Sequence, residues 1–535
     1  MPVSFDALKT FTLHTPARQV SMDLAFQPPH VSENPSLYKS NTVMGLYLQY
    51  FVLGLLYQSF SSFTEPLFTN YFHMVPPQSN LIGAFTTIAW SCKVVFGILS
   101  DCFPIWGYRR KSWMILGWSC CAILLVVLAT MRHGRPYVPP NTPQPSNSTN
   151  SGNPQDHGLL VSTLCGIITV FYVLAIVAAD AMVVELSEAE PDPTRGRLLA
   201  YMYMARNIGT GVAQALVALL LNAKVYGGDY TWGVSVNAYF ALLATHVVLL
   251  VPLITCLLHE ATHPTINCPQ YLGEFWDIVQ VRPMWQTMLF AFGFNLFTSV
   301  LSVVATPVVK YDWAHVSPQH NRWMNVAGAV SSCAGLWFVS HVARDWGWRS
   351  VLALLVVVQV VLGATVDFVT IYNVVRNEWM TLIMGVVCAA PQGAVDFLPC
   401  LAFLELTTDG KEGITYGMLT TMANIAYMFT PFLGTAIVSQ FDVPDGDDSA
   451  TARHRVATPL CIGYALYVSA CAFLVLLPNQ KYHIRFMRAY GGQQPVMAML
   501  TLLLCFGCVL ATVVTSLFKV FPSTMCQSDG WGTTC

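Results

Sequence analysis

Charged side chains are scarce in this sequence. Asp, Glu, Lys and Arg make up 10% of its 535 residues, whereas an ordinary soluble domain carries about 25%. The chain therefore lacks the polar surface that a water-exposed protein of this length needs. Its formal net charge is only −2 at neutral pH, so nucleic acid is not an expected partner.

Several sequence signals of catalysis are also missing. No Gly-x4-Gly-Lys-Ser/Thr loop occurs, so ATP is not expected to supply a driving force. No Ser/His/Asp set or paired-cysteine metal pattern stands out, and we expect no cofactor, no metal and no enzymatic activity. The first forty or so residues lack an apolar core and a cleavage site, which favours a tail over a signal peptide.

Long apolar runs are abundant instead. Residues of the hydrophobic types make up 54% of the chain, and most fall into runs of about 20 residues or more, enough to cross a hydrocarbon layer about 30 Å thick. Backbone groups in lipid must be satisfied within the segment, so these runs should be helices. The expected spans are residues 43–70, 79–100, 112–131, 158–184, 198–221, 233–258, 284–309, 320–342, 351–375, 379–404, 414–440, 458–477 and 495–518.

An internal repeat divides these spans. Asp101 and the Gly-Tyr-Arg-Arg of residues 107–110 follow the second span, and Asp345 with Trp-Gly-Trp-Arg follows the eighth. Two six-helix halves with a site at their interface form one major transporter architecture. The sequence therefore predicts an all-α membrane protein with five parts: a cytoplasmic tail (1–42), an N-terminal half (43–258), a cytoplasmic linker with an interfacial helix (259–283), a C-terminal half (284–477), and a segment holding a basic turn, a thirteenth span and a short extracellular tail (478–535).

Two features orient the chain in its membrane. Lys and Arg collect moderately on the side that includes the N-terminus and residues 109–111, which predicts that this side is cytoplasmic. The Asn147-Ser148-Thr149 sequon then lies on the opposite side, where glycans are added; an unused sequon is the alternative. Cys526 and Cys535 would share that oxidising side, either as a disulfide or as two free thiols. The sequence does not distinguish between the plasma membrane and an organelle membrane as the location of the chain.

The most specific motif runs from Lys93 to Lys111. It contains Gly97, Ser100-Asp101, Pro104, Gly107 and Arg109-Arg110. An Asp that ends a helix can accept hydrogen bonds from neighbouring helix N-termini, and the basic run holds the loop in the cytoplasm. The stretch resembles the loop signature of the major facilitator superfamily and, more narrowly, the folate–biopterin transporter family. That family usually has proline after the lysine, where Val94 stands here, a departure that bears on local helix bending.

Other stretches carry the same resemblance. Asp180 and Glu185 lead into Arg195-Gly196 and Arg206, and the second half has Pro391-Gln392-Gly393, Leu398-Pro399 and residues 412–424. The resemblance implies the major facilitator fold, alternating access and a small-molecule cargo, either folate or a pterin such as biopterin. S-adenosylmethionine is the alternative cargo, and symport with protons follows by analogy alone. The sequence does not identify protein partners. A sensor of the same fold that no longer transports is a competing function.

Three charges are expected at similar depth in one half: Lys93, Asp180 and Arg206. A charged residue at such depth costs at least ~2.5–3.5 kcal/mol, so these side chains should share a hydrated interior. We predict that Lys93 and Arg206 recognise an anionic substrate while Asp180 holds them between cycles. With Glu185 nearby, a structural ion network that closes the cytoplasmic gate is the competing interpretation; Gly97, Asp101, Gly107, Arg109 and Arg110 form the gate motif.

Asp367 and Asp396 are isolated acids in the ninth and tenth spans. A lone buried carboxyl can carry a proton, so either is a candidate for proton coupling; the alternative is a hydrogen-bonded Asp at a helix kink. The first, second and fifth spans also carry rings on which a flat heteroaromatic ligand could stack, although such rings more often serve as packing: Tyr47, Tyr50, Phe51, Tyr57, Trp90, Tyr201 and Tyr203.

One motif points to a different class. The sequence His-Glu-Ala-Thr-His at residues 259–263 matches the zinc-protease pattern. That pattern needs a helix through both histidines, and Pro264 disfavours helical geometry at His263. A membrane metalloprotease is therefore a minor alternative.

Overall fold

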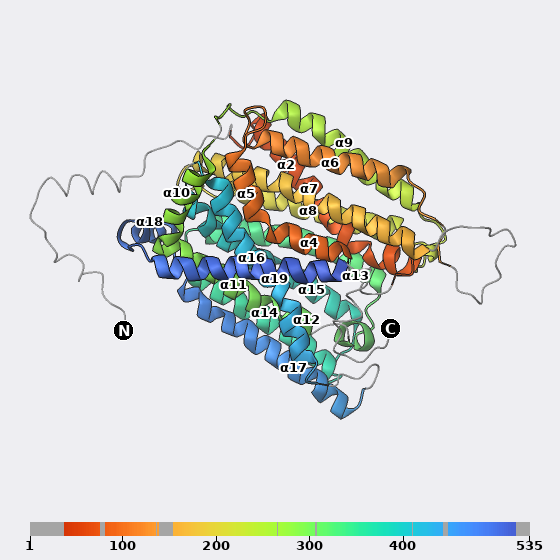
Figure 1. Ribbon diagram of the computed structural model, residues 1–535. Coiled ribbons are helices and arrows are strands. Elements are labelled where there is room, and N and C mark those ends of the chain that lie inside the picture. Colours follow the sequence, from red (N-terminus) through yellow and green to blue (C-terminus); the bar gives the residue numbers. More distant parts are fainter. Residues whose placement is uncertain are drawn as a thin grey trace, which may run out of the picture.

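Helices account for almost all regular structure in the computed structural model, which describes residues 37–74, 81–134, 136–137, 154–264, 266–304, 308–408, 410–441 and 448–520. Figure 1 shows them running side by side in one elongated bundle. Asn147, Cys526 and Cys535 lie outside the described residues, so the predicted glycan and disulfide stay predictions.

The N-terminal half contains the elements up to residue 257. Within it α2 packs on α8, and α6 packs on α7 and α9. Its elements are α2 (Asn41–Ser62), η2 (Thr64–Tyr71), α4 (Leu81–Ser91), α5 (Lys93–Cys102), α6 (Lys111–Thr130), α7 (Pro154–Glu188), α8 (Arg197–Leu220), η3 (Lys224–Tyr226) and α9 (Val236–Leu257).

A linker with α10 (Cys268–Gln280) leads into the C-terminal half. There α11 packs on α16, and α15 packs on α13 and α14. Its elements are α11 (Arg282–Ser299), α12 (Leu301–Val304), η4 (Val308–Trp313), α13 (Pro318–Phe338), η5 (Val339–Ala343), α14 (Trp348–Ile371), α15 (Glu378–Leu406), α16 (Glu412–Val438), α17 (Ala450–Ser469) and η6 (Ala470–Val475).

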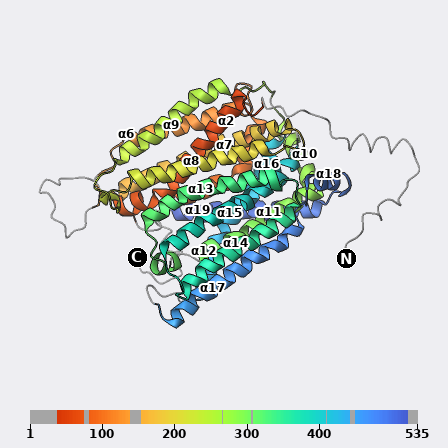
Figure 2. The ribbon, with the colours of Figure 1, turned by 180° about the vertical axis from the view of Figure 1, so that it is seen from behind.

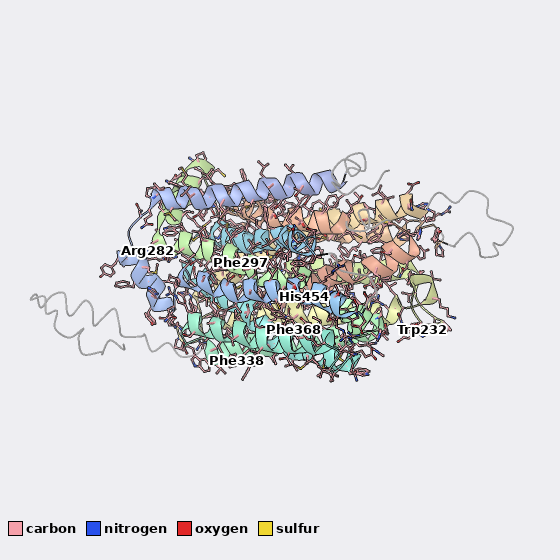
Figure 3. The ribbon with its side chains drawn as sticks, turned by 90° about the horizontal axis from the view of Figure 1, so that it is seen from below. Trp232, Arg282, Phe297, Phe338, Phe368 and His454 are labelled. Atoms are coloured by element: carbon pink, nitrogen blue, oxygen red, sulfur yellow. The ribbon has the colours of Figure 1, made fainter. Side chains whose placement is uncertain are left out.

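The two halves meet on two sides of the bundle. On one side α8 packs against α13, which Figure 2 shows side by side from behind. On the other side α16 packs against α4, α5 and α7. Two further helices, α18 (Lys481–Tyr490) and α19 (Pro495–Val520), follow the C-terminal half. In Figure 3 α19 lies on the outside of the bundle, and it contacts α4 of one half and α11 and α16 of the other.

The helices agree with a membrane-spanning bundle. In the described part of the chain, eleven helices are long and apolar enough to cross a membrane, and counting the bent pair α4–α5 as one span makes twelve. Helix α8 has the length but is more polar, because it carries Arg206, Asn207 and several small residues. Helix α19 is among the eleven, and its role as a thirteenth span remains a prediction.

The second span bends although it lacks a proline after Lys93. Helices α4 and α5 meet at Cys92 at an angle of 48°. The backbone N–H of Val94 donates to the Thr421 hydroxyl of α16 at 3.2 Å. Insertion of a side chain into the backbone ladder is a known cause of a kink. A proline at position 94 would interrupt the backbone hydrogen bonds because it has no N–H group. Here Thr421 of the neighbouring helix interrupts them by accepting the Val94 N–H.

Candidate functional site

A cavity of about 450 Å³ lies between the two halves. The N-terminal half contributes α2, α4, α5, α7 and α8, and the C-terminal half contributes α11, α15 and α16. Its lining mixes aromatic rings with charges and amides, chiefly Tyr50, Tyr57, Trp90, Lys93, Asp180, Tyr203, Arg206, Asn295, Gln392, Asp396, Asn424 and Tyr427. Such a wall can bind a flat polar molecule by stacking and hydrogen bonding.

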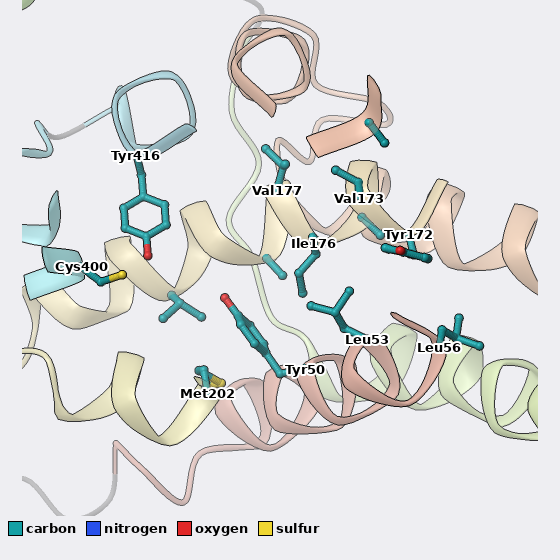
Figure 4. Close-up of a cluster of buried hydrophobic side chains, with 14 of the residues drawn as sticks. Tyr50, Leu53, Leu56, Tyr172, Val173, Ile176, Val177, Met202, Cys400 and Tyr416 are labelled. Atoms are coloured by element: carbon teal, nitrogen blue, oxygen red, sulfur yellow. The ribbon is translucent and has the colours of Figure 1, made fainter. Parts of the chain in front are cut away.

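Lys93 and Asp180 form a buried ion pair on this wall. The Lys93 Nζ lies 2.8 Å from Asp180 Oδ2, with side-chain exposures of 4% and 9%. The Tyr50 hydroxyl donates to Asp180 Oδ1, and Figure 4 shows Tyr50 of α2 and Tyr416 of α16 pointing their hydroxyls into the space between the helices. The Lys93 ammonium also sits 5.1 Å from the Trp90 ring centroid. Its charge is therefore compensated within one half.

Arg206 has a different environment. Its guanidinium lies 5.6 Å from the ring of Tyr57, 5.8 Å from that of Trp90 and 5.9 Å from that of Tyr203. Among the described residues no carboxylate lies within ion-pair distance of it. Cation–π contacts hold the group in place, and its donors make no hydrogen bond to any other residue that the structure describes. The cavity thus contains one neutralised cation and one that can accept an anionic partner.

The two isolated acids of the second half lie in different places. Asp396 of α15 lines the cavity, and Gln392 Nε2 donates to its Oδ1 at 2.9 Å. Asp367 of α14 does not line it; the Tyr464 hydroxyl of α17 donates to Asp367 Oδ2 at 2.6 Å. Asp367 instead borders a smaller pocket with Lys310 and Cys388. Of these two acids, only Asp396 can therefore contact a molecule in the central cavity.

Asp101 joins three segments at the α10 end of the bundle. Its buried carboxylate accepts hydrogen bonds from the Tyr271 hydroxyl of α10 and from the backbone N–H of Ile414, the latter at 2.9 Å. It also pairs with Arg109 and Arg110. The Ile414 N–H lies in the first turn of α16, where the helix favours a negative charge. The halves and the linker are thus tied at one carboxylate.

Two arginines extend this contact across the halves. Arg110 Nη2 lies 3.0 Å from Glu412 Oε2, and Arg109 Nη2 donates to the Gly410 carbonyl at 2.8 Å. Burial alone would lower the pKa of Arg110, but the nearby carboxylates, Asp101 and Glu412 first, outweigh it and raise that pKa. Glu185 contributes to this field and does not line the cavity, so it lies with the gate charges rather than the cavity charges.

Glycine at position 97 permits the close approach of α5 and α16. A Cβ added to Gly97 would lie 2.4 Å from the Gly413 carbonyl oxygen, which belongs to the backbone and cannot easily move. Gly107 has φ +81°, a left-handed conformation that favours glycine. Its carbonyl accepts the His263 N–H at 2.8 Å. Both glycines of the motif therefore serve backbone contacts.

The His-Glu-Ala-Thr-His stretch has no helix and a different role. Helix α9 ends at Leu257, so the spacing that brings two histidines to one metal is absent. The Glu260 carboxylate instead accepts the backbone N–H groups of Arg109, Arg110 and Lys111 at 2.8, 2.9 and 2.7 Å. These groups begin α6, so Glu260 caps that helix. The described residues hold no cluster of three metal ligands.

Some residues of the site were not predicted from the sequence. Tyr271 was expected only as part of an interfacial helix, yet it reaches Asp101. Gln392 and Thr421 were not singled out for the contacts they make with Asp396 and Val94. The Tyr271–Asp101 and Thr421–Val94 contacts join segments far apart in the chain, whereas Gln392 and Asp396 lie one turn apart on α15. The one local signal was the amide of Gln392 in the Pro-Gln-Gly stretch, four residues before Asp396.

Comparison with known proteins gives a family match and two curated relatives. A model described as the BT1 family matches residues 54–142. "Folate transporter 1" of Plasmodium falciparum is 34% identical over 67 residues, which cover 12% of this chain and 13% of that protein. "Folate-biopterin transporter" of Synechocystis sp. is 20% identical over 419 residues, 75% of each chain. These matches confirm the predicted resemblance.

Solved structures share the fold. The human organic anion transporter MFSD10 (TETRAN) aligns with a TM-score of 0.54 at 15% identity, covering 81% of this chain and 99% of that one. A D-xylose-proton symporter aligns with a TM-score of 0.55 at 13% identity, covering 82% and 98%. The predicted major facilitator fold is confirmed, and the relatives and neighbours are transporters rather than enzymes.

Proposed function

We propose that this chain, a relative of the folate–biopterin transporters with the major facilitator fold, is a secondary transporter of a folate or a related pterin. The observation that carries the proposal is the Arg206 guanidinium, which sits among three aromatic rings in a cavity between the halves. A pterin ring can stack on such rings. A folate tail offers carboxylates, which a guanidinium binds in bidentate fashion.

Alternating access is part of the proposal. At the α10 end, the contacts of Asp101, Arg109 and Arg110 with the start of α16 close the interface between the halves. Toward the other end, a second cavity of about 350 Å³ shares Gln392 with the central one. This arrangement supports a state that receives cargo from the side opposite the gate. Release would then require the gate contacts to separate.

Proton symport is assigned to Asp396 and not to Asp367. Asp396 borders the central cavity, where a protonation change can act on bound cargo. Asp367 is removed from it and bound by Tyr464. We expect Asp396→Asn to abolish uptake driven by a pH gradient while exchange of labelled for unlabelled cargo persists. Asp367→Asn is the matched control; equal pH dependence of uptake in Asp396→Asn and wild type would refute the assignment.

The function is tested by uptake of radiolabelled folate and biopterin into cells that express the chain. Arg206→Lys should raise the KM for folate about tenfold or more, as expected for loss of a charged hydrogen-bonded pair. Biopterin has no carboxylate, so its KM should change far less. Arg453→Lys, a surface residue paired with Asp448, controls for the loss of a guanidinium. Unchanged folate affinity in both Arg206→Lys and Arg206→Ala would end the recognition hypothesis.

S-adenosylmethionine is the second candidate cargo. The Asp396 carboxylate and the surrounding rings could bind its sulfonium. Competition decides between the two: excess unlabelled folate, biopterin or S-adenosylmethionine is added to the labelled-folate assay. Inhibition by S-adenosylmethionine alone, with no folate uptake, would favour that cargo and reject the pterin class.

A further inference from the structure

A separate cavity of about 250 Å³ opens at the same end of the bundle as α10. It is formed by the first residues of α11 and α14, the end of η6 and one face of α18. In Figure 3 its residue Arg282 marks that end of the molecule. Three basic side chains line it: Arg282, Arg349 and His483. Among the described residues, no acidic side chain lines this cavity.

The two arginines reach the cavity without a carboxylate partner. Arg349 is held by backbone carbonyls, with Nε donating to Leu477 at 2.5 Å and Nη2 to Val475 at 2.9 Å. These bonds fix the guanidinium and leave its positive charge uncompensated. Arg282 begins α11 and is exposed, and no acid in the described part of the chain forms an ion pair with it.

His483 adds a third donor. The backbone N–H of Asn479 donates to its Nδ1 at 3.2 Å, so the proton of the neutral ring sits on Nε2. Burial, with the charges of Arg349 and Arg282, lowers the pKa of His483 below its ordinary value. With Nδ1 occupied as an acceptor, the Nε2–H of the ring is the donor that faces a ligand. Two guanidinium groups and this N–H suit a ligand that carries only acceptors, namely an anion.

The rim of the cavity is apolar. Val475, Phe486 and Tyr490 border it and are 70%, 60% and 75% exposed. Aromatic residues at the end of a membrane bundle are typical of the lipid–water interface. An amphipathic helix with exposed aromatic residues lies in that interface. A soluble anion needs no such rim, whereas a lipid presents its acyl chains beside its headgroup.

The other face of α18 is already occupied. Arg485 pairs with Asp192 at 2.7 Å, Lys481 donates to the Asp192 carbonyl at 2.7 Å, and Arg488 binds the carbonyls of Leu406 and Thr407. These contacts fix the rotation of the helix. His483, Phe486 and Tyr490 are thus held toward the cavity and not toward the protein core.

We propose that this cavity binds the phosphate of an anionic phospholipid in the leaflet at the gate end of the bundle. Arg282, Arg349 and His483 contact the headgroup, and Phe486 and Tyr490 lie along the acyl chains. Basic pockets between membrane helices bind such headgroups. The site is independent of the cargo cavity, since the two share no lining residue.

Native mass spectrometry of the purified full chain tests this. The protein is mixed with dioleoylphosphatidylglycerol or with dioleoylphosphatidylcholine, and bound lipids are counted. We expect preferential binding of phosphatidylglycerol. Arg282→Gln should weaken it about fivefold, as for one basic residue at an anionic surface, and Arg282→Gln with His483→Gln should weaken it further. Arg132→Gln removes an exposed arginine at the opposite end and should have no effect.

Three results of the lipid-binding measurement would overturn the proposal. They are equal binding of the two lipids, unchanged phosphatidylglycerol binding in Arg282→Gln, and an equal loss in Arg132→Gln. Inorganic phosphate provides the remaining arm. If phosphate alone raises the Tm of delipidated protein as much as phosphatidylglycerol does, and Phe486→Ser alters neither, the site is for a soluble anion and the lipid assignment fails. If Phe486→Ser weakens only the lipid, the lipid assignment stands.

Discussion

Arg110 and Glu412 form an ion pair 3.0 Å long, although the first precedes α6 of one half and the second begins α16 of the other. Their side chains are only 2% and 4% exposed. A buried pair is costly to break, because removal of one partner leaves the other charge buried. Separation of the halves at this end therefore requires that this buried ion pair be broken and both charges be rehydrated.

The first prediction concerns the close approach at Gly97. Gly97→Ala places a methyl group against the Gly413 carbonyl, at a cost of about 1–3 kcal/mol for overpacking. The halves should separate more readily there, and the thiol of Cys102, which is 1% exposed, should react severalfold faster with N-ethylmaleimide. Peptide mass spectrometry measures this rate. Gly83→Ala, whose added methyl meets nothing within 4 Å, is the control, and equal rates in both variants would contradict the prediction.

The second prediction concerns the ion pair on the cavity wall. Asp180→Asn leaves the Lys93 ammonium buried without its counter-ion, which should cost about 3–5 kcal/mol and lower the Tm in detergent. The double variant Lys93→Met, Asp180→Leu should lose less, since no charge remains. Arg485→Gln, in a pair with Asp192 whose two side chains are 51% and 39% exposed, should change stability by less than about 1 kcal/mol. A double variant as unstable as Asp180→Asn would show that the charges are not the cause.

A third prediction separates the helix cap from a metal site. Glu260→Ala removes the acceptor for three N–H groups at the start of α6 and should destabilise the protein by about 1–2 kcal/mol. His259→Ala with His263→Ala should have little effect, and a chelator should not change the Tm of the wild type. Stoichiometric zinc that disappears in the histidine variant would reverse this interpretation.

The orientation of the chain gives a fourth prediction. If residues 132–157 face the lumen or the cell exterior, glycosidase treatment should reduce the apparent mass of the wild type, and Asn147→Gln should migrate like the treated protein. A loop that faces the cytoplasm would yield no shift in either sample. A shift would also fix the side of the membrane on which the Asp101 contacts lie, since they belong to the opposite end of the bundle.

Hydropathy alone was enough to predict most of the fold. The helices follow the expected spans closely because lipid requires every backbone group to be satisfied inside its own segment. Helix α8 was predicted as residues 198–221 and forms at Arg197–Leu220, although Arg206 and Asn207 leave it outside the helices apolar enough to cross a membrane. The bend at Cys92 could not be predicted, because it depends on Thr421, more than three hundred residues away in the chain.

The sequence was enough to predict which charged residues form the site, but not which of them pair with one another. Depth along the helices placed Lys93, Asp180 and Arg206 near one another, but helix rotation decides which cation meets the acid. Sequence spacing gives no access to that rotation. The structure pairs Lys93 with Asp180 and surrounds Arg206 with rings. The basic cavity beside α18 combines the starts of α11 and α14 with residues 475–491, and these three stretches lie far apart in the sequence.

The sharing of Asp101 has a consequence for how the halves can part. One carboxylate serves Tyr271, Ile414 and two arginines. A small displacement of α16 would therefore take the Ile414 N–H from Asp101 and, at the same time, separate Glu412 from Arg110. Partly separated geometries are then less favourable than either end point. We therefore expect the halves to part at this junction in one cooperative step, with a barrier set by the rehydration of the Asp101 side chain.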